Sequence, residues 1–167
     1  MGLLMAVTVV MIILSGVLDF NTLFLLAAAS FCVGIAFRES NTQTAAGFYL
    51  ASLILGILLA PNKLYCITYA AMGLYILASE FSYDLLGKVK YKSTRKTLLW
   101  VVKYVIFNLM YIPALLYLPG TFYAGKISSG LIAGFIVIGQ VALLVYDIAY
   151  VYFQGYVWGK LRRNLKL

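Results

Sequence analysis

Apolar residues fill most of the chain and are interrupted only by short polar breaks. Three of these breaks are Asp19–Asn21, Arg38–Asn41 and Pro61–Lys63, and a basic stretch separates the fourth apolar segment from the fifth. Polar and apolar residues do not alternate within the segments, which argues against a lipid-facing β-barrel and favours helices. The pattern predicts six helical segments over residues 3–18, 22–37, 44–60, 64–81, 98–118 and 127–158.

The composition supports the same picture, because 64% of the residues are hydrophobic and only 11% are charged. Soluble domains are roughly half apolar and a quarter charged. We therefore expect an all-α, multi-pass protein of the cell membrane, with residues 1–167 forming one transmembrane bundle whose first segment is retained. The first three segments are short for full spans, so a re-entrant pair is an alternative. The polar breaks between them favour full crossings.

The lysine and arginine residues predict the orientation of the bundle. They cluster in 88–96 and 160–166, and interfacial tryptophans at Trp100 and Trp158 flank these clusters. Basic residues beside membrane spans concentrate on the cytoplasmic side. With six spans, both clusters and both termini lie in the cytoplasm. Nucleic-acid binding is a poor explanation of the net charge of +8, because membrane lipid accounts for it.

Three charged residues fall inside or at the inner ends of the predicted spans. They are Glu80, Lys103 and Asp147. Because an unpaired charge in lipid is costly, we expect Lys103 to pair with Asp147 or with Glu80. The pair would serve helix packing or the coupling of the protein to a partner.

Polar and aromatic residues recur at the outer side and near mid-depth. An outward pocket walled by such residues would suit a small organic ligand, whereas an ordinary aromatic belt at the lipid interface is the alternative. The candidate ligand-binding residues are Asp19, Asn21, Asn62, Tyr69, Asn108, Tyr111 and Gln140.

The sequence offers little for catalysis. It contains no histidine, no nucleotide-binding glycine motif and no catalytic serine motif. Cys32 and Cys66 both lie in apolar segments, where we expect them to be buried free thiols. We therefore expect a protein that is not an enzyme and that holds no metal or cofactor.

Some stretches resemble the substrate-binding S component of energy-coupling factor transporters of bacteria. They are 59–63 (Leu-Ala-Pro-Asn-Lys), 69–75 (Tyr-Ala-Ala-Met-Gly-Leu-Tyr), Tyr146-Asp147, and Tyr156 with 160–163 (Lys-Leu-Arg-Arg). The six-span plan with both termini inside is similar across nearly the whole chain. The AxxxA docking motif of that family is missing, because Val10 stands four residues after Ala6.

This resemblance implies a vitamin-like small molecule held near the outer face for uptake into the cell. It also implies a transmembrane T component and cytoplasmic ATPase subunits as partners. The alternative is a non-catalytic scaffold that shares the six-helix plan, as the membrane subunit of the rod-shape machinery does.

Overall fold

The computed structural model describes residues 1–18, 21–88, 92–117 and 129–160, and this part of the chain is helical with short connections. It contains six α-helices, a short 3-10 turn (Leu86–Lys88) after the fourth, and a π-helical segment, η3 (Phe153–Trp158), after the last. The α-helices are α1 (Gly2–Ser15), α2 (Thr22–Glu39), α3 (Thr42–Leu59), α4 (Lys63–Leu85), α5 (Lys92–Tyr117) and α7 (Ser129–Tyr152).

Several of these helices are long and apolar enough to cross a membrane. Among the described residues, four meet that standard: Thr22–Glu39, Thr42–Leu59, Lys63–Leu85 and Gly134–Trp158. The first helix ends at Ser15, before the predicted limit of residue 18, and has 14 residues. At 1.5 Å per residue it is about 21 Å long, which is shorter than a hydrocarbon core of about 30 Å.

Asparagine residues begin two of the helices. The Asn41 side chain accepts a hydrogen bond from the Thr44 backbone N–H at the start of α3, and Asn62 accepts one from the Leu64 N–H at the start of α4. Such N-caps satisfy backbone donors that a helix leaves free. Ala60, which precedes Pro61, has an extended backbone because the proline ring disfavours the helical conformation there. This extended residue ends α3.

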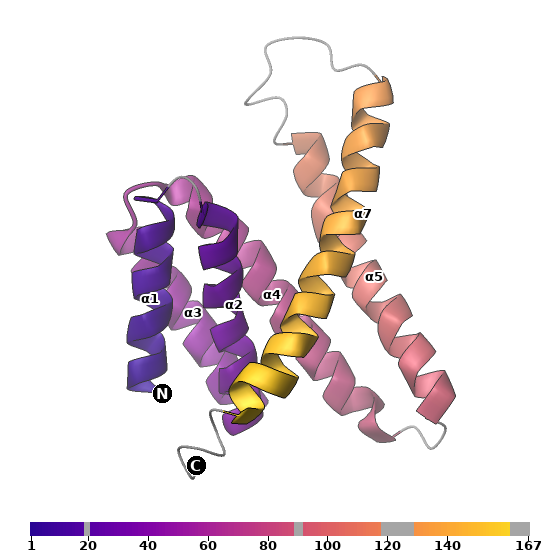
Figure 1. Cartoon of the computed structure of the whole chain (residues 1–167), viewed down its shortest axis with the longest axis horizontal. Coiled ribbons are helices and arrows are strands. Elements are labelled where there is room, and N and C mark those ends of the chain that lie inside the picture. The colour runs from indigo at the N-terminus through magenta and orange to yellow at the C-terminus, as the bar shows by residue number, and fades with distance from the viewer. Residues whose placement is uncertain (19–20, 89–91, 118–128, 161–167) are drawn as a thin grey trace.

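Helices α1 to α4 form the N-terminal half of the molecule (Figure 1). Helix α2 contacts α1, α3 and α4, and is the most buried helix of this half. Small residues allow close approach here, because a Cβ on Gly56 would already touch Ile12 of α1 at 3.3 Å. The core of this half includes Ile12, Leu26, Val33, Phe48, Tyr49 and Tyr69, and both cysteines, buried and free as expected.

Helices α5 and α7 form a hairpin that leans away from this half at one end and returns to it at the other (Figure 1). The lower part of α7 and η3 reach α2, whereas the upper parts of α5 and α7 stand clear of α1 to α3. The N-terminus and the end of η3 lie at the same end of the molecule, together with the α2–α3 connection, the end of α4 and the start of α5. We call this the basic end, because it carries Arg38, Arg95, Lys96 and Lys160.

Candidate functional site

One face of α7 and η3 carries a row of polar and aromatic side chains, which we call the polar ridge. Successive members from Asp147 onward are three or four residues apart, so they lie along one side of the helix. Each bonds to another element of the fold, so the ridge joins the hairpin to the N-terminal half. The ridge consists of Gln140, Tyr146, Asp147, Tyr150, Gln154 and Trp158.

The ion pair of the ridge joins α5 to α7. Lys103 Nζ lies 2.6 Å from Asp147 Oδ1, and the Tyr75 hydroxyl donates to the same oxygen at 3.3 Å. Only 17% of the lysine side chain and 5% of the aspartate side chain are exposed. Of the two partners expected for Lys103, the structure thus selects Asp147. A buried pair of this kind removes the cost of two single charges in lipid.

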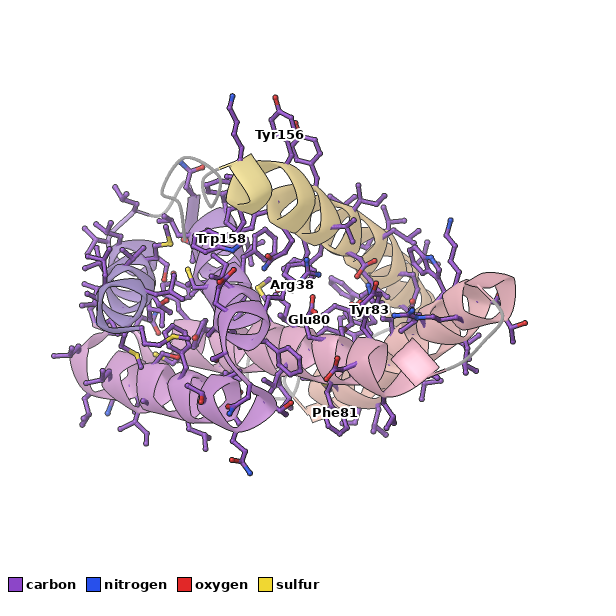
Figure 2. The ribbon with its side chains drawn as sticks, turned by 90° about the horizontal axis from the view of Figure 1, so that it is seen from below. Arg38, Glu80, Phe81, Tyr83, Tyr156 and Trp158 are labelled. Atoms are coloured by element: carbon purple, nitrogen blue, oxygen red, sulfur yellow. The ribbon has the colours of Figure 1, made fainter. Side chains whose placement is uncertain are left out.

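Glu80 has a different partner from the one its position suggested. Arg38, at the end of α2, donates through Nε and Nη2 to Glu80 Oε1 at 3.1 and 2.6 Å, and the Tyr150 hydroxyl donates to this oxygen at 2.6 Å. Glu80 therefore joins α2, α4 and α7 at one point near the basic end (Figure 2). The guanidinium also lies 5.9 Å from the centre of the Tyr150 ring. Three bonds to one buried oxygen make this a strong junction.

The π-helical segment continues the ridge to the end of α2. Gln154 is buried and donates to the Phe31 carbonyl at 3.4 Å, while the Trp158 indole donates to Glu39 Oε1 at 3.0 Å. Widened helical turns of this type occur frequently at functional sites. Residues 161–163 lie outside the described part of the chain.

An apolar cleft of about 190 Å³ lies where the hairpin meets α4. Its wall is almost entirely apolar and aromatic. Its three tyrosine hydroxyls are already used, because Tyr75 donates to Asp147, Tyr111 donates to the Phe135 carbonyl, and Tyr146 bonds to Ser30 at 2.7 Å. The cleft is therefore suited to an apolar body with few polar groups. It is lined by Ala71, Met72, Tyr75, Phe107, Met110, Tyr111, Ala142, Leu143 and Tyr146.

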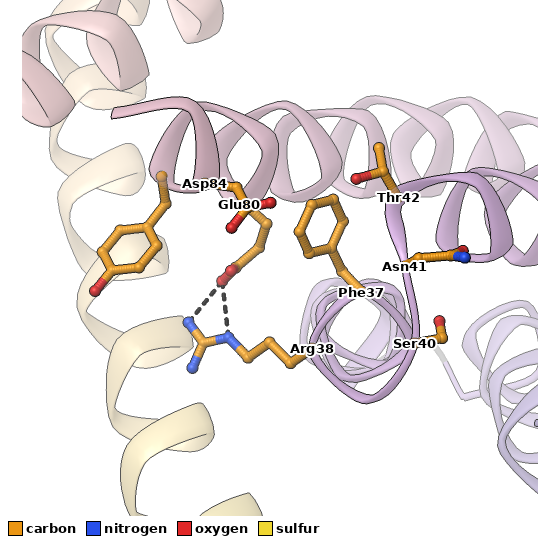
Figure 3. A pocket seen from close by; sticks show the side chains of 8 residues that line it. Phe37, Arg38, Ser40, Asn41, Thr42, Glu80 and Asp84 are labelled. Carbon is orange, nitrogen blue, oxygen red and sulfur yellow. Dashed lines mark hydrogen bonds and ion pairs between the residues drawn. The ribbon is translucent and has the colours of Figure 1, made fainter. Parts of the chain in front are cut away.

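A second, polar cavity of about 540 Å³ opens at the basic end (Figure 3). Its wall combines the end of α2, the start of α3 and the last turns of α4. The carboxylates of Glu80 and Asp84 point into the same space, with Phe37 beside them (Figure 3). The cavity is lined by Phe37, Arg38, Ser40, Asn41, Thr42, Glu80, Tyr83 and Asp84.

The residues expected to hold a ligand near the outer face do not share one pocket. Asn108, Tyr111 and Gln140 do come together: Gln140 donates to Asn108 Oδ1 at 2.8 Å, and the Tyr111 hydroxyl donates to the Phe135 carbonyl at 2.7 Å. These bonds hold α5 against α7. Tyr69, in contrast, is fully buried in the N-terminal half and bonds to Ser52 at 2.6 Å, so it offers no surface to a ligand.

The asparagines at the connections opposite the basic end have local roles. Asn62 caps α4, and Asn21 precedes the first residue of α2. Asp19 lies outside the described residues. Of the expected ligand-binding residues that the structure describes, only Tyr111 lines the apolar cleft.

Most residues of the polar ridge and of the polar cavity were not predicted from the sequence. The spacing of Tyr146, Tyr150, Gln154 and Trp158 at four-residue intervals was the available signal, but it resembled an interfacial aromatic pattern. Arg38 was assigned to a loop, whereas it lies in the last turn of α2. The chain matches no protein-family model, no curated protein and no solved structure.

Proposed function

We propose that this chain is a plasma-membrane protein that crosses the bilayer six times, with both termini in the cytoplasm. The N-terminus and the end of η3 lie at the same end of the molecule, and the basic residues at that end support this proposal (Figure 1). Lys63 stands at the opposite end, at the start of α4. The short α1 crosses by thinning the bilayer locally and by placing its flanking residues at the interface.

The orientation can be tested by cysteine labelling. Cys32 and Cys66 are first replaced by alanine, and a single cysteine is then placed at Lys63 or at Lys96. With a membrane-impermeant maleimide on intact cells, we expect labelling of Lys63→Cys alone. Labelling of Lys96→Cys should require permeabilised cells. The opposite pattern would overturn the orientation, and equal labelling of both before permeabilisation would overturn the spanning arrangement.

We further propose that the protein binds a small, largely apolar, vitamin-like molecule for uptake and has no catalytic chemistry of its own. The observation that carries this proposal is the apolar cleft between α4, α5 and α7. Ligand sites in membrane bundles lie between helices, and flexible methionines such as Met72 and Met110 adapt to an apolar guest. A volume of about 190 Å³ limits the guest to one or two rings.

Energy for uptake would come from partners in this proposal. A transmembrane T component and cytoplasmic ATPase subunits would supply ATP hydrolysis, as the resemblance to S components implies. The Lys103–Asp147 pair joins the two helices of the hairpin beside the cleft, and the Arg38–Glu80 pair holds Tyr150 of α7, so a partner that loosens either pair would change access to the cleft.

Native mass spectrometry of the purified protein tests ligand binding. We expect a small molecule to co-purify with the wild type and to be lost from Ala71→Phe and Ala142→Phe, which fill the cleft. Ala149→Phe is the matched control, because Ala149 is an exposed alanine of α7 that does not line the cleft. A bound molecule that survives both cleft-filling changes would refute the assignment of the cleft.

A non-catalytic membrane scaffold is the second candidate. The bonds from Gln140 to Asn108 and from Tyr111 to the Phe135 carbonyl favour it, because they use polar groups that a ligand would otherwise contact. The same purification separates the two functions. A scaffold would yield partner membrane proteins and no small molecule, and its association with them would be unaffected by Ala142→Phe.

A further inference from the structure

The span formed by α7 and η3 is the least buried of the four candidate spans. In its most apolar stretch 22% of the residues are buried, against 28%, 39% and 50% in the other three. Its mean hydropathy of 1.9 is also the highest of the four. The polar ridge occupies one face of this span, and another face is exposed, with Tyr156 pointing away from the other helices (Figure 2).

The exposed face of α7 carries a regular row of residues, which we call the α7 stripe. Its members are separated alternately by four and three residues, which is the spacing of the contact positions in a coiled coil. Ile138, Val145 and Ile148 are 65%, 63% and 63% exposed. At Gly134 an added Cβ would meet nothing within 4 Å, so a neighbouring helix has room to approach closely there. The stripe consists of Gly134, Ile138, Val141, Val145, Ile148 and Tyr152.

The side chains of this face differ from those on another exposed helix of the same chain. Among the described residues of α7, every large aliphatic side chain that is exposed is isoleucine or valine, except Leu144. On α3 most are leucine, namely Leu50, Leu55, Leu58 and Leu59. Isoleucine and valine have one strongly preferred rotamer in a helix, so they lose little entropy when they pack. This matters in lipid, where helices gain little from the hydrophobic effect when they associate.

A second copy of this chain has the right chemistry to cover the stripe. In the six-span arrangement proposed above, two copies have the same orientation, so their α7 helices are parallel and equivalent residues lie at the same depth. A two-fold axis along the membrane normal then brings Val145 to Val145 and Gly134 to Gly134, which is a self-complementary contact. The stripe has no charged or hydrogen-bonding side chain from Gly134 to Ile148, so nothing in that part opposes the pairing of identical residues.

We propose that two copies of this chain form a dimer in the membrane through parallel packing of their α7 stripes. The dimer depends on the proposed membrane orientation but not on ligand binding in the apolar cleft. It places the cleft and the polar ridge within each copy and uses only the face of α7 that the fold leaves exposed.

Disulfide cross-linking in vesicles tests the contact. In the variant in which alanine replaces Cys32 and Cys66, a single cysteine is placed at Val145 or, as the matched control, at Ile54, an exposed residue of α3. After oxidation with copper phenanthroline in phosphatidylcholine vesicles, we expect a covalent dimer from Val145→Cys and little or none from Ile54→Cys. Equal cross-linking of the two variants would indicate random collision and would overturn the proposal, as would no cross-linking of Val145→Cys. The labelling of Lys63→Cys and Lys96→Cys shows separately whether the orientation itself is at fault.

A measurement of affinity completes the test. Copies of the cysteine-free variant labelled with donor or acceptor dyes at Lys96→Cys report association by energy transfer as the vesicles are diluted with lipid. We expect Val141→Phe to raise the dissociation constant about tenfold, because the larger ring overpacks the contact. Ile54→Phe should leave it unchanged. Both positions are exposed in the single chain, so circular dichroism should not change. A Val141→Phe protein that associates as tightly as its parent would refute the α7 contact.

Discussion

Replacing Lys103 by methionine should destabilise the folded protein by about 3 kcal/mol, because it leaves the buried Asp147 carboxylate without its partner. Methionine keeps most of the volume and the apolar stem of lysine. The loss of stability is therefore due to the unpaired Asp147 carboxylate and not to a cavity. The free energy of unfolding, followed by circular dichroism during titration with sodium dodecyl sulfate, measures the effect. Lys63→Met serves as the control, since Lys63 is an exposed lysine at the start of α4.

The double variant Lys103→Met with Asp147→Leu tests whether the pair adds stability or only neutralises two buried charges. Replacing both partners by apolar groups removes the stranded charge, so we expect most of the lost stability to return. This recovery would show that the pair satisfies two buried charges and adds little stability beyond that. A double variant that is as unstable as Lys103→Met would contradict this explanation and would assign Asp147 a role through Tyr75.

Gly34→Ala should lower the free energy of unfolding by about 2 kcal/mol, which is the second largest loss that we expect. A Cβ at this position would overlap the Tyr150 hydroxyl and would lie 2.8 Å from Gln154 Nε2. Tyr150 would have to move and would lose its bond to Glu80. Overpacking costs about 1–3 kcal/mol, and a broken buried hydrogen bond adds a similar amount. The unfolding titration in sodium dodecyl sulfate measures this loss.

A matched glycine and a double-mutant cycle make this prediction specific. Gly47 lies inside α3, and a Cβ there would meet nothing within 4 Å, so Gly47→Ala should be neutral or stabilising. In a Tyr150→Phe background the hydroxyl is absent, and Gly34→Ala should then cost clearly less than in the wild type. Equal costs in the two backgrounds would show that contact with the tyrosine hydroxyl is not the reason.

The order of hydrophobic and polar residues along the chain was enough to predict the helices. Segment boundaries agree with the observed helices to within a few residues in the N-terminal half, because polar breaks and N-caps such as Asn41 and Asn62 act locally. Two helix ends differ most: α1 stops at Ser15 and not at residue 18, and α4 continues to Leu85 and not to residue 81. Gly16 and the residues after it are apolar enough to continue a span, so hydrophobicity alone did not reveal that the helix stops at Ser15.

The sequence also showed that Lys103, Glu80 and Asp147 needed partners, since an unpaired charge in lipid is expensive whatever the fold. Which partners they have was decided by tertiary structure alone. Pairing depends on how α7 crosses α5 and returns to α2, and that crossing brings Asp147 to Lys103 and Tyr150 to the Arg38–Glu80 pair. Both cavities likewise arise from the spacing between helices, which residue order along one helix does not encode. The order of residues along the chain was thus enough to predict the helices and the charged residues that need partners. The packing of those helices decided which partners they have and where the candidate sites lie.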